Sequence, residues 1–157
     1  MPPDRAAEVI GLLREREATV ATAESLTAGL VCAALTSVPG ASAVVRGGLV
    51  VYATDLKTKL AGVAADLLTE HGAVHPAVAA QLAVGARTAC GATYGLGLTG
   101  VAGPDPQDGV SPGRVYLALA GPAGATARVL DADGGRPAVR AAAVVAAVDL
   151  LHAELRR

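Results

Sequence analysis

The chain has 157 residues, which fits one domain over residues 1–157 with a single hydrophobic core. Its formal net charge is −1, and it contains three Tyr but no Phe or Trp. A nucleic-acid binder needs a basic face or aromatic stacking platforms, so this composition argues against direct binding of nucleic acid. Without an uninterrupted apolar stretch of ~20 residues or a secretory signal, the sequence predicts no membrane association and a cytoplasmic location.

The first third of the chain alternates between helical and extended patterns. Apolar positions at helical spacing predict a helix over 4–16, and a short β-like stretch follows at 18–23. A second helix is expected over 26–37, where Val38-Pro39-Gly40 ends it. Residues 47–53 then read as a buried strand that begins at a glycine pair.

The middle of the chain favours helices. A short helix begins at Thr54 or Asp55 and runs to Leu60, and another covers 64–71 with Gly72 as its stop. His75-Pro76 opens a longer helix to about residue 90, with His75 as its cap and Pro76 at the first helical position.

The last third contains the remaining strands. Strands are expected over 94–99, 114–120 and 125–131, with a long loop at 100–113 and a final helix over 137–156. Strands and helices alternate early, and an antiparallel hairpin comes late. This order predicts an α/β fold, a three-layer α/β/α sandwich around a mostly parallel mixed sheet with one antiparallel strand.

Functional groups follow the carboxyl ends of the expected strands, which is where open α/β sheets bind ligands. Ser25 stands where the strand 18–23 turns into a helix, in the segment "TVATAESLTAGL". Its hydroxyl could cap that helix. It could also act as a nucleophile, because free backbone N–H groups at a helix start stabilise an oxyanion.

A serine nucleophile needs a base, and Lys57 is the best placed candidate. We expect Lys57 in the first turn of its helix, where the helix field and burial both lower the pKa of an amine. Tyr52, five residues earlier at the strand end, could relay a proton or fix the lysine. The alternative for Lys57 is a solvated surface charge, which is also the expectation for Lys59.

The histidines, cysteines and loop acids favour ordinary roles. His71 is expected in the last turn of a helix and His152 at the surface. Cys32 and Cys90 read as small buried apolar residues. Asp105 and Asp108 have no His or Cys companions at metal-ligand spacing, so we expect turn acids, no metal site and no cofactor. The glycine-rich loop 100–113 is not a P-loop but could cradle a phosphate.

Three segments in order carry a family resemblance: "TAESLTAG" (22–29), "RGGLVVYATDLKTKLAGV" (46–63) and "LTGVAGP" (98–104). They resemble the C-terminal domain of the competence/damage-inducible protein CinA. That domain also exists by itself as nicotinamide-nucleotide amidohydrolase, the NMN deamidase. The likeness to the domain covers about 20–155, and we expect this chain to be similar to the stand-alone form.

The resemblance implies metal-independent hydrolysis of nicotinamide mononucleotide (NMN) to nicotinate mononucleotide and ammonia, serving NAD recycling. It assigns the nucleophile to Ser25 and assisting roles to Tyr52 and Lys57. The substrate-binding residues that we expect are Glu24, Thr27, Ala28, Gly29, Arg46, Thr99, Gly100, Gly103 and Arg140, with Arg136 a weaker candidate for the phosphate.

Leu26, where a cysteine is common, and three further positions depart from the pattern of the family. Ala28 stands where a glycine is common, His75 where a serine is common, and Arg114 where a small hydroxyl residue is common. Ala28 and Arg114 favour an alternative function: a non-catalytic domain that binds a nucleotide or a protein in competence or DNA-damage physiology. The apolar helix 137–151 also predicts a homodimer or a higher homo-oligomer.

Overall fold

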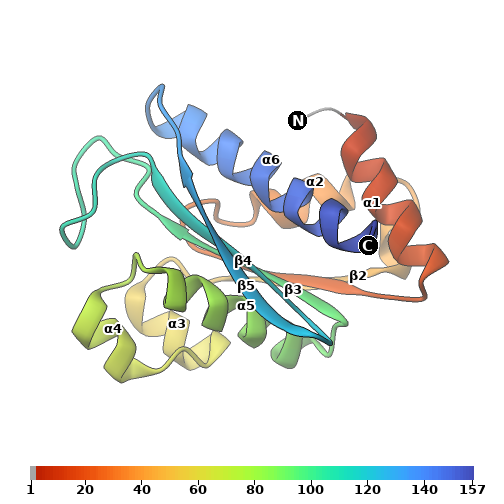
Figure 1. The fold of residues 1–157 in the computed structure, drawn as a ribbon, viewed down its shortest axis with the longest axis horizontal. Helices are drawn as coiled ribbons and strands as arrows, with labels where there is room; N and C mark the ends of the chain where they lie inside the picture. The colour runs from red at the N-terminus through yellow and green to blue at the C-terminus, as the bar shows by residue number, and fades with distance from the viewer. Residues whose placement is uncertain (1–2) are drawn as a thin grey trace.

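A computed structural model describes residues 3–157. Within that range the chain forms alternating helices and strands, shown in Figure 1. In chain order they are α1 (Pro3–Glu15), β1 (Val20–Glu24), α2 (Leu30–Thr36), the short 3-10 helix η1 (Ala41–Ala43), β2 (Val45–Val50), α3 (Thr54–Ala61), α4 (Ala65–His71), α5 (Pro76–Cys90), β3 (Tyr94–Gly100), β4 (Arg114–Gly121), β5 (Gly124–Asp131) and α6 (Arg136–Leu155).

The strands form a five-stranded sheet in the order β2-β1-β3-β4-β5. Strand β1 pairs in parallel with both β2 and β3, whereas β4 is antiparallel to its neighbours β3 and β5. The sheet is therefore mostly parallel with one antiparallel strand, as the order of elements predicted. Because β1, β2 and β3 run in the same direction, their carboxyl ends lie at one edge of the sheet.

Helices cover both faces of the sheet (Figure 1). Helices α1, α2 and α6 pack on one face, where leucines such as Leu13, Leu35 and Leu151 meet Leu96 and Leu98 of β3. Helices α3, α4 and α5 cover the other face, in a cluster that includes the small side chains of β1. This arrangement is the predicted three-layer sandwich.

Helix α5 lies unusually close to β3 because that strand carries glycines where it meets the helix. A Cβ atom added to Gly95 would lie 2.0 Å from the backbone oxygen of Ala83, and one added to Gly97 would lie 2.4 Å from that of Ala79. These distances are too short for any side chain. The pattern "YGLGL" therefore serves packing in this strand.

The second helix starts later than its sequence pattern indicates. Residues 25–29 form a turn, in which Ala28 has φ 46° and Gly29 has φ 97°. Both values lie in the left-handed region, which an α-helix cannot continue through. Helix α2 therefore begins at Leu30, with Gly29 as its cap, and a separate turn of five residues follows β1.

The expectation that His152 lies at the surface is wrong. Its side chain is buried between α6 and α1, where Nε2 lies 2.6 Å from a carboxylate oxygen of Glu8 and Nδ1 lies 3.3 Å from Arg5. Arg5 also forms an ion pair with Asp149. The apolar periodicity of the last helix gave no indication that its polar residues meet partners on the first helix.

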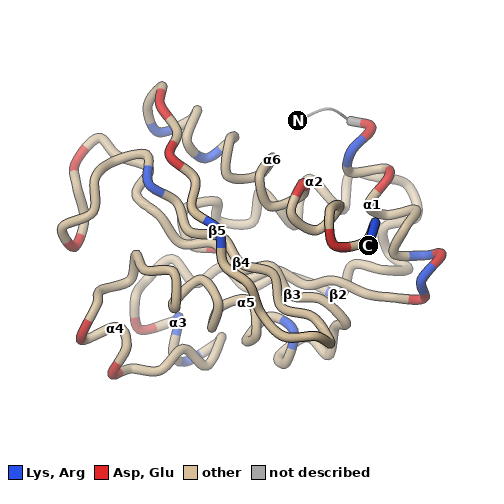
Figure 2. The backbone as a smooth tube through the Cα atoms, viewed as in Figure 1, with Lys and Arg blue, Asp and Glu red and all other residues tan. Residues whose placement is uncertain are grey.

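Cys32 and Cys90 are free and half-buried rather than fully buried. Acidic and basic residues are interspersed along the helices and connecting segments (Figure 2). None of the helices in residues 3–157 is long and apolar enough to cross a membrane.

Candidate active site

A cavity of about 470 Å³ opens at the edge of the sheet where β1 and β3 end. Its size is within the range of small-molecule sites. Its walls come from the ends of β1 and β3, the start of α3, the segment before α5, the loop after β3 and the start of α6. The lining residues are Ser25, Leu26, Tyr52, Ala53, Thr54, Ala73, Val74, Thr99, Gly100, Val101, Ala102, Gly103, Pro104, Asp105, Pro106, Gln107 and Arg136.

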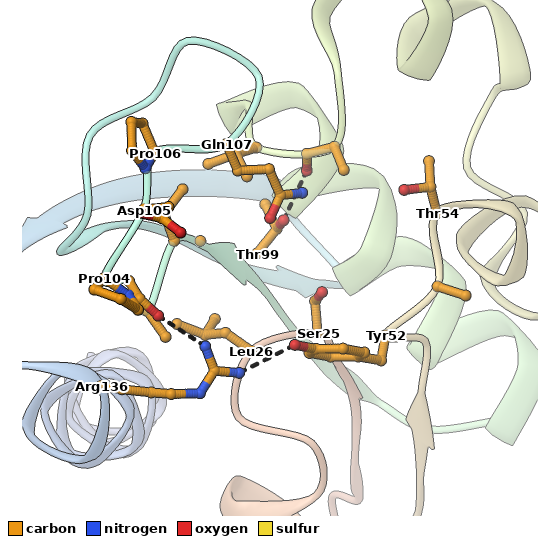
Figure 3. A pocket seen from close by; sticks show the side chains of 17 residues that line it. Ser25, Leu26, Tyr52, Thr54, Thr99, Pro104, Asp105, Pro106, Gln107 and Arg136 are labelled. Carbon is orange, nitrogen blue, oxygen red and sulfur yellow. Dashed lines mark hydrogen bonds between the residues drawn. The ribbon is translucent and has the colours of Figure 1, made fainter.

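Ser25 is the first residue after β1, and its hydroxyl points into this cavity (Figure 3). The backbone holds it on two sides: its N–H donates to the carbonyl of Leu98, and its own carbonyl accepts from the N–H of Ala28. Only 8% of the residue is exposed. The alternative role as a helix cap is wrong, because α2 begins five residues later and has no side-chain cap.

Lys57 is buried, with 1% of its surface exposed. Its Nζ donates to the backbone carbonyls of Val51, at 2.8 Å, and Tyr52, at 3.2 Å. Burial lowers the pKa of this amine from 10.5 to about 8, because a charged group is poorly solvated inside the protein. The alternative of a solvated surface charge is therefore wrong for Lys57, whereas Lys59 is exposed and pairs with Asp55.

Lys57 stands behind the wall of the cavity rather than in it. Within residues 3–157 its amine forms no hydrogen bond with Ser25, and Lys57 is not among the lining residues. The carbonyl that it contacts belongs to Tyr52, which does line the cavity together with Ser25. The structure thus brings Ser25 and Tyr52 to one cavity and places the lysine amine beneath Tyr52.

Tyr52 and Arg136 meet at the mouth of the cavity (Figure 3). The guanidinium of Arg136 donates to the hydroxyl of Tyr52 at 3.0 Å and to the carbonyl of Gly103, also at 3.0 Å. Tyr52 remains 58% exposed. Among the described residues, Arg136 is the one cationic side chain that lines the cavity, so an anionic part of a ligand would find its charge partner there.

The loop after β3 is tied to its surroundings rather than loose. The N–H of Gly113 donates to the carbonyl of Val101, and Asp108 accepts from the N–H of Ala73. The hydroxyl of Thr99 donates to the carbonyl of Ala73, so Thr99 supports the wall of the cavity. Asp108 therefore anchors a loop, where the sequence predicted a solvated turn acid.

Glu24 does not reach the cavity, contrary to the expectation that it binds substrate. Its fully buried carboxylate accepts from the N–H groups of Val31 and Cys32, at 2.9 and 3.1 Å, and from the hydroxyl of Thr22. The carboxylate thereby accepts hydrogen bonds from backbone N–H groups in the first turn of α2, which have no partner within the helix and favour a negative charge. Glu24 fixes the helix that follows the Ser25 turn.

The rest of the turn also lies outside the cavity. Thr27 is fully buried, and within residues 3–157 its hydroxyl has no hydrogen-bond partner. Ala28 and Gly29 supply the left-handed backbone that reverses the chain before α2. Their positions do not support the expected contacts with substrate, because none of the three lines the cavity.

Two arginines that we expected to bind substrate contact backbone carbonyls elsewhere. Arg46 lies at the amino end of β2, the opposite end from the cavity, and its Nε donates to the carbonyl of Cys90 at 2.7 Å. Arg140 lies on α6 and donates through Nε to the carbonyl of Leu26 at 2.9 Å. Neither lines the cavity, so these positions do not support direct contact with substrate.

Of the other expected residues, Thr99, Gly100 and Gly103 do line the cavity. Thr54 and Gln107 line it too, although sequence reasoning assigned them no role in binding. Thr54 starts α3 shortly after β2 ends at Val50, which is a usable signal for a residue at this edge. Among the described residues no group of three or more His, Cys, Asp or Glu side chains is arranged to hold a metal ion.

Comparison with known proteins identifies the family of the chain. A family model described as the CinA C-terminal domain matches residues 4–155. The chain belongs to the CinA C-terminal domain family. It is 51% identical to a CinA-like protein of Frankia casuarinae over 144 residues, which make up 92% of this chain and 33% of that protein. The chain thus spans about a third of the length of this curated relative.

Solved CinA-family structures have the same fold over nearly the whole chain. The competence/damage inducible protein CihA from Agrobacterium tumefaciens superposes with a TM-score of 0.93 at 35% identity, covering 99% of this chain and 95% of that one. A competence damage-inducible protein A from Klebsiella pneumoniae gives a TM-score of 0.95 at 29% identity, covering 99% and 97%.

Two departures from the CinA pattern leave the cavity intact. Arg114 forms a two-point ion pair with Asp131 across the β4–β5 hairpin and does not line the cavity. His75 caps α5 as predicted, because its Nδ1 accepts from the N–H of Ala77 at 3.1 Å. A serine hydroxyl at this position could accept the same hydrogen bond.

Proposed function

We propose that this CinA-family domain is an amidohydrolase that converts nicotinamide mononucleotide to nicotinate mononucleotide and ammonia. The observation that carries the proposal is the Ser25 hydroxyl, which points into a cavity shared with Tyr52, whose backbone carbonyl is hydrogen-bonded to the buried amine of Lys57. A hydroxyl nucleophile and an amine with a lowered pKa are the two groups that a serine–lysine amidase requires.

Lys57 supplies the base. A neutral amine has two N–H bonds and one lone pair, and the carbonyls of Val51 and Tyr52 accept two hydrogen bonds from Nζ. The lone pair is then left to take a proton. With a pKa of about 8, roughly a tenth of the protein carries the neutral amine at pH 7, far more than an ordinary lysine would.

In the proposed reaction the Ser25 oxygen attacks the carboxamide carbon of the substrate while its proton passes to Lys57. The tetrahedral intermediate collapses as Lys57 returns that proton to the amide nitrogen, which leaves as ammonia. Water then hydrolyses the acyl-serine ester to the carboxylate and restores the serine. The proton transfer requires Ser25 and Lys57 to approach in the substrate complex, since catalytic hydrogen bonds often form only there. Tyr52 accepts a hydrogen bond from Lys57 through its backbone carbonyl and lines the same cavity as Ser25.

A substrate with one phosphate suits the mouth of the cavity. The guanidinium of Arg136 has five N–H donors, and the two hydrogen bonds to Tyr52 and Gly103 leave donors for phosphate oxygens. The first turn of α3, at Thr54, adds backbone N–H groups to the same cavity. The carboxamide would then lie deeper, at Ser25.

Ammonia release from NMN tests the proposal directly. We expect the purified protein to be active and Ser25→Ala to lower kcat on the order of 1000-fold or more, because removal of a nucleophile eliminates the covalent route. Ser37→Ala is the matched control, since Ser37 is exposed at the end of α2. Equal turnover by wild type and Ser25→Ala would exclude Ser25 as the nucleophile.

The second candidate is a non-catalytic domain that binds a nucleotide or a protein. It is favoured by the absence of a hydrogen bond between Lys57 and Ser25 within residues 3–157. A thermal shift with NMN in a protein that releases no ammonia would support this function over the amidase.

A further inference from the structure

Arg140 holds the Ser25 turn from outside the cavity. It lies on α6, and its Nε donates to the carbonyl of Leu26, which is 114 residues away in the chain. Leu26 lines the cavity next to Ser25, whereas Arg140 does not. The arginine therefore contacts the backbone that carries the nucleophile without contacting the space that a substrate would fill.

Every carbonyl at the start of this turn has a donor. The carbonyl of Ser25 accepts from the N–H of Ala28, that of Leu26 from Arg140, and that of Thr27 from the N–H of Leu30. Three N–H groups of the turn, those of Leu26, Thr27 and Gly29, have no acceptor within residues 3–157. Of these three residues, only Leu26 lines the cavity. The residue after the nucleophile thus keeps a free backbone donor at the edge of the cavity.

The direction of that donor follows from peptide geometry. In a planar trans peptide the C=O and the N–H point in opposite directions. The carbonyl of Ser25 points into the turn toward Ala28, so the N–H of Leu26, in the same peptide unit, points out of the turn. Arg140 holds the next carbonyl, so both peptide units that flank Leu26 are fixed.

We propose that Arg140 is a positioning residue that keeps the N–H of Leu26 oriented as the hydrogen-bond donor to the oxyanion that forms when Ser25 attacks. This inference rests on the proposed amidase function. Charge develops on the substrate carbonyl oxygen only as the bond to Ser25 forms, so a fixed donor stabilises the transition state more than the bound substrate. Loss of Arg140 therefore acts on kcat rather than on KM.

The kinetic test compares Arg140→Met and Arg140→Lys with wild type on NMN. We expect kcat of Arg140→Met to fall about 10- to 100-fold, up to the loss seen when one oxyanion donor is removed. KM should stay within about threefold, and Arg140→Lys, which keeps a donor, should recover part of kcat. The pH dependence of the rate should not shift, because the base is unchanged.

Arg87→Met is the matched control. Arg87 also donates from Nε to a backbone carbonyl, that of Thr93 at 2.8 Å, but before β3 at the opposite end of the sheet. It should leave kcat unchanged. A kcat for Arg140→Met within twofold of wild type, or a loss in KM alone, overturns the proposal.

Amide hydrogen exchange separates this inference from the proposed function. The N–H groups of Ala28 and Leu30 close the turn, and we expect them to exchange at least about 10-fold faster in Arg140→Met but not in Arg87→Met. If wild type releases no ammonia, the amidase proposal fails while this measurement still decides whether Arg140 holds the turn. Unchanged exchange in Arg140→Met overturns the positioning role.

Discussion

The amine of Lys57 lies 3.2 Å from the backbone carbonyl oxygen of Tyr52, and the hydroxyl of the same tyrosine accepts a hydrogen bond from Arg136. Tyr52 therefore joins the buried amine behind the cavity to the guanidinium at its mouth. These contacts link the end of β2 to the starts of α3 and α6. The proposed base and the proposed phosphate-binding residue thus contact the same residue, one at its backbone carbonyl and the other at its side-chain hydroxyl.

The pH dependence of the rate should follow the deprotonation of the Lys57 amine. Burial lowers the pKa of this amine to about 8, so kcat/KM for NMN should rise with pH and level off above a midpoint near 8. Lys57→Met and Lys57→Arg should both lose activity, since an arginine stays protonated throughout this range. Lys59→Met, on the exposed face of the same helix, should keep the wild-type profile.

Stability should also depend on Lys57, with a defined sign. Below pH 8 the lysine is protonated in both the folded and the unfolded protein, so the full cost of burying the charge is present. Between pH 8 and 10.5 the unfolded state binds more protons, so the folded state gains stability as pH rises. The shift corresponds to a gain on the order of 3 kcal/mol.

The measurement is the free energy of unfolding in urea for wild type and Lys57→Met at several pH values. The free energy of unfolding of Lys57→Met minus that of wild type should be most positive at pH 7. This difference should fall by a few kcal/mol toward pH 10.5, on the order given by the pKa change. Lys59→Met against wild type should show no comparable trend. A difference that stays constant with pH would mean that the Lys57 amine is not desolvated.

Arg136 should contribute to binding rather than to chemistry. Arg136→Met is expected to raise KM for NMN about 10-fold or more with kcat within about threefold, because a charge-assisted contact to phosphate is lost in substrate and transition state alike. Arg128→Met on β5, where the arginine contacts a carbonyl of its own strand, is the control. Free nicotinamide has no phosphate, so its turnover should not respond to Arg136→Met; an equal loss on both substrates would contradict the assignment.

The backbone of the Ser25 turn offers a test of strain at Ala28. With φ at 46°, Ala28 occupies a region that costs a residue with a Cβ about 1 kcal/mol or more. Glycine removes that cost. Its greater conformational freedom in the unfolded state, however, lowers the free energy of unfolding by about 0.5–1 kcal/mol. Ala28→Gly should therefore leave the free energy of unfolding unchanged or raise it slightly.

Ala141→Gly is the comparison for this substitution, because Ala141 is exposed within α6. There a glycine should lower the free energy of unfolding by about 1 kcal/mol. If Ala28→Gly loses as much stability as Ala141→Gly, the turn carries no strain that glycine relieves.

Much of the site was predictable because its main residues stand at the ends of strands that are locally encoded. Apolar runs and glycine and proline stops located β1, β2 and β3, and in a parallel sheet the residues after such strands collect at one edge. Ser25, Tyr52 and Thr99 could be found in this way. The family motifs lie over the same segments, so both lines of reasoning chose the same residues.

The directions and partners of long side chains were not predictable. Glu24 stands beside Ser25 in sequence, yet its carboxylate turns to the N–H groups of α2, away from the cavity. Arg136 and Arg140 share one helix, but Arg136 lines the cavity and reaches Tyr52, whereas Arg140 lies outside the cavity and reaches the backbone of Leu26. Arg46 lies at the amino end of β2 rather than after its carboxyl end, so it lies at the other end of the sheet.

The sequence by itself determined the order of helices and strands, the mixed sheet and the residues at its carboxyl edge, because each depends on periodicity and stop signals within a few neighbouring residues. Tertiary structure decided which of those residues face the cavity, that Lys57 is buried enough for its pKa to fall, and that His152 packs against Glu8 rather than facing solvent. Burial and contacts of this kind depend on segments that are remote in the chain and meet only when the layers pack.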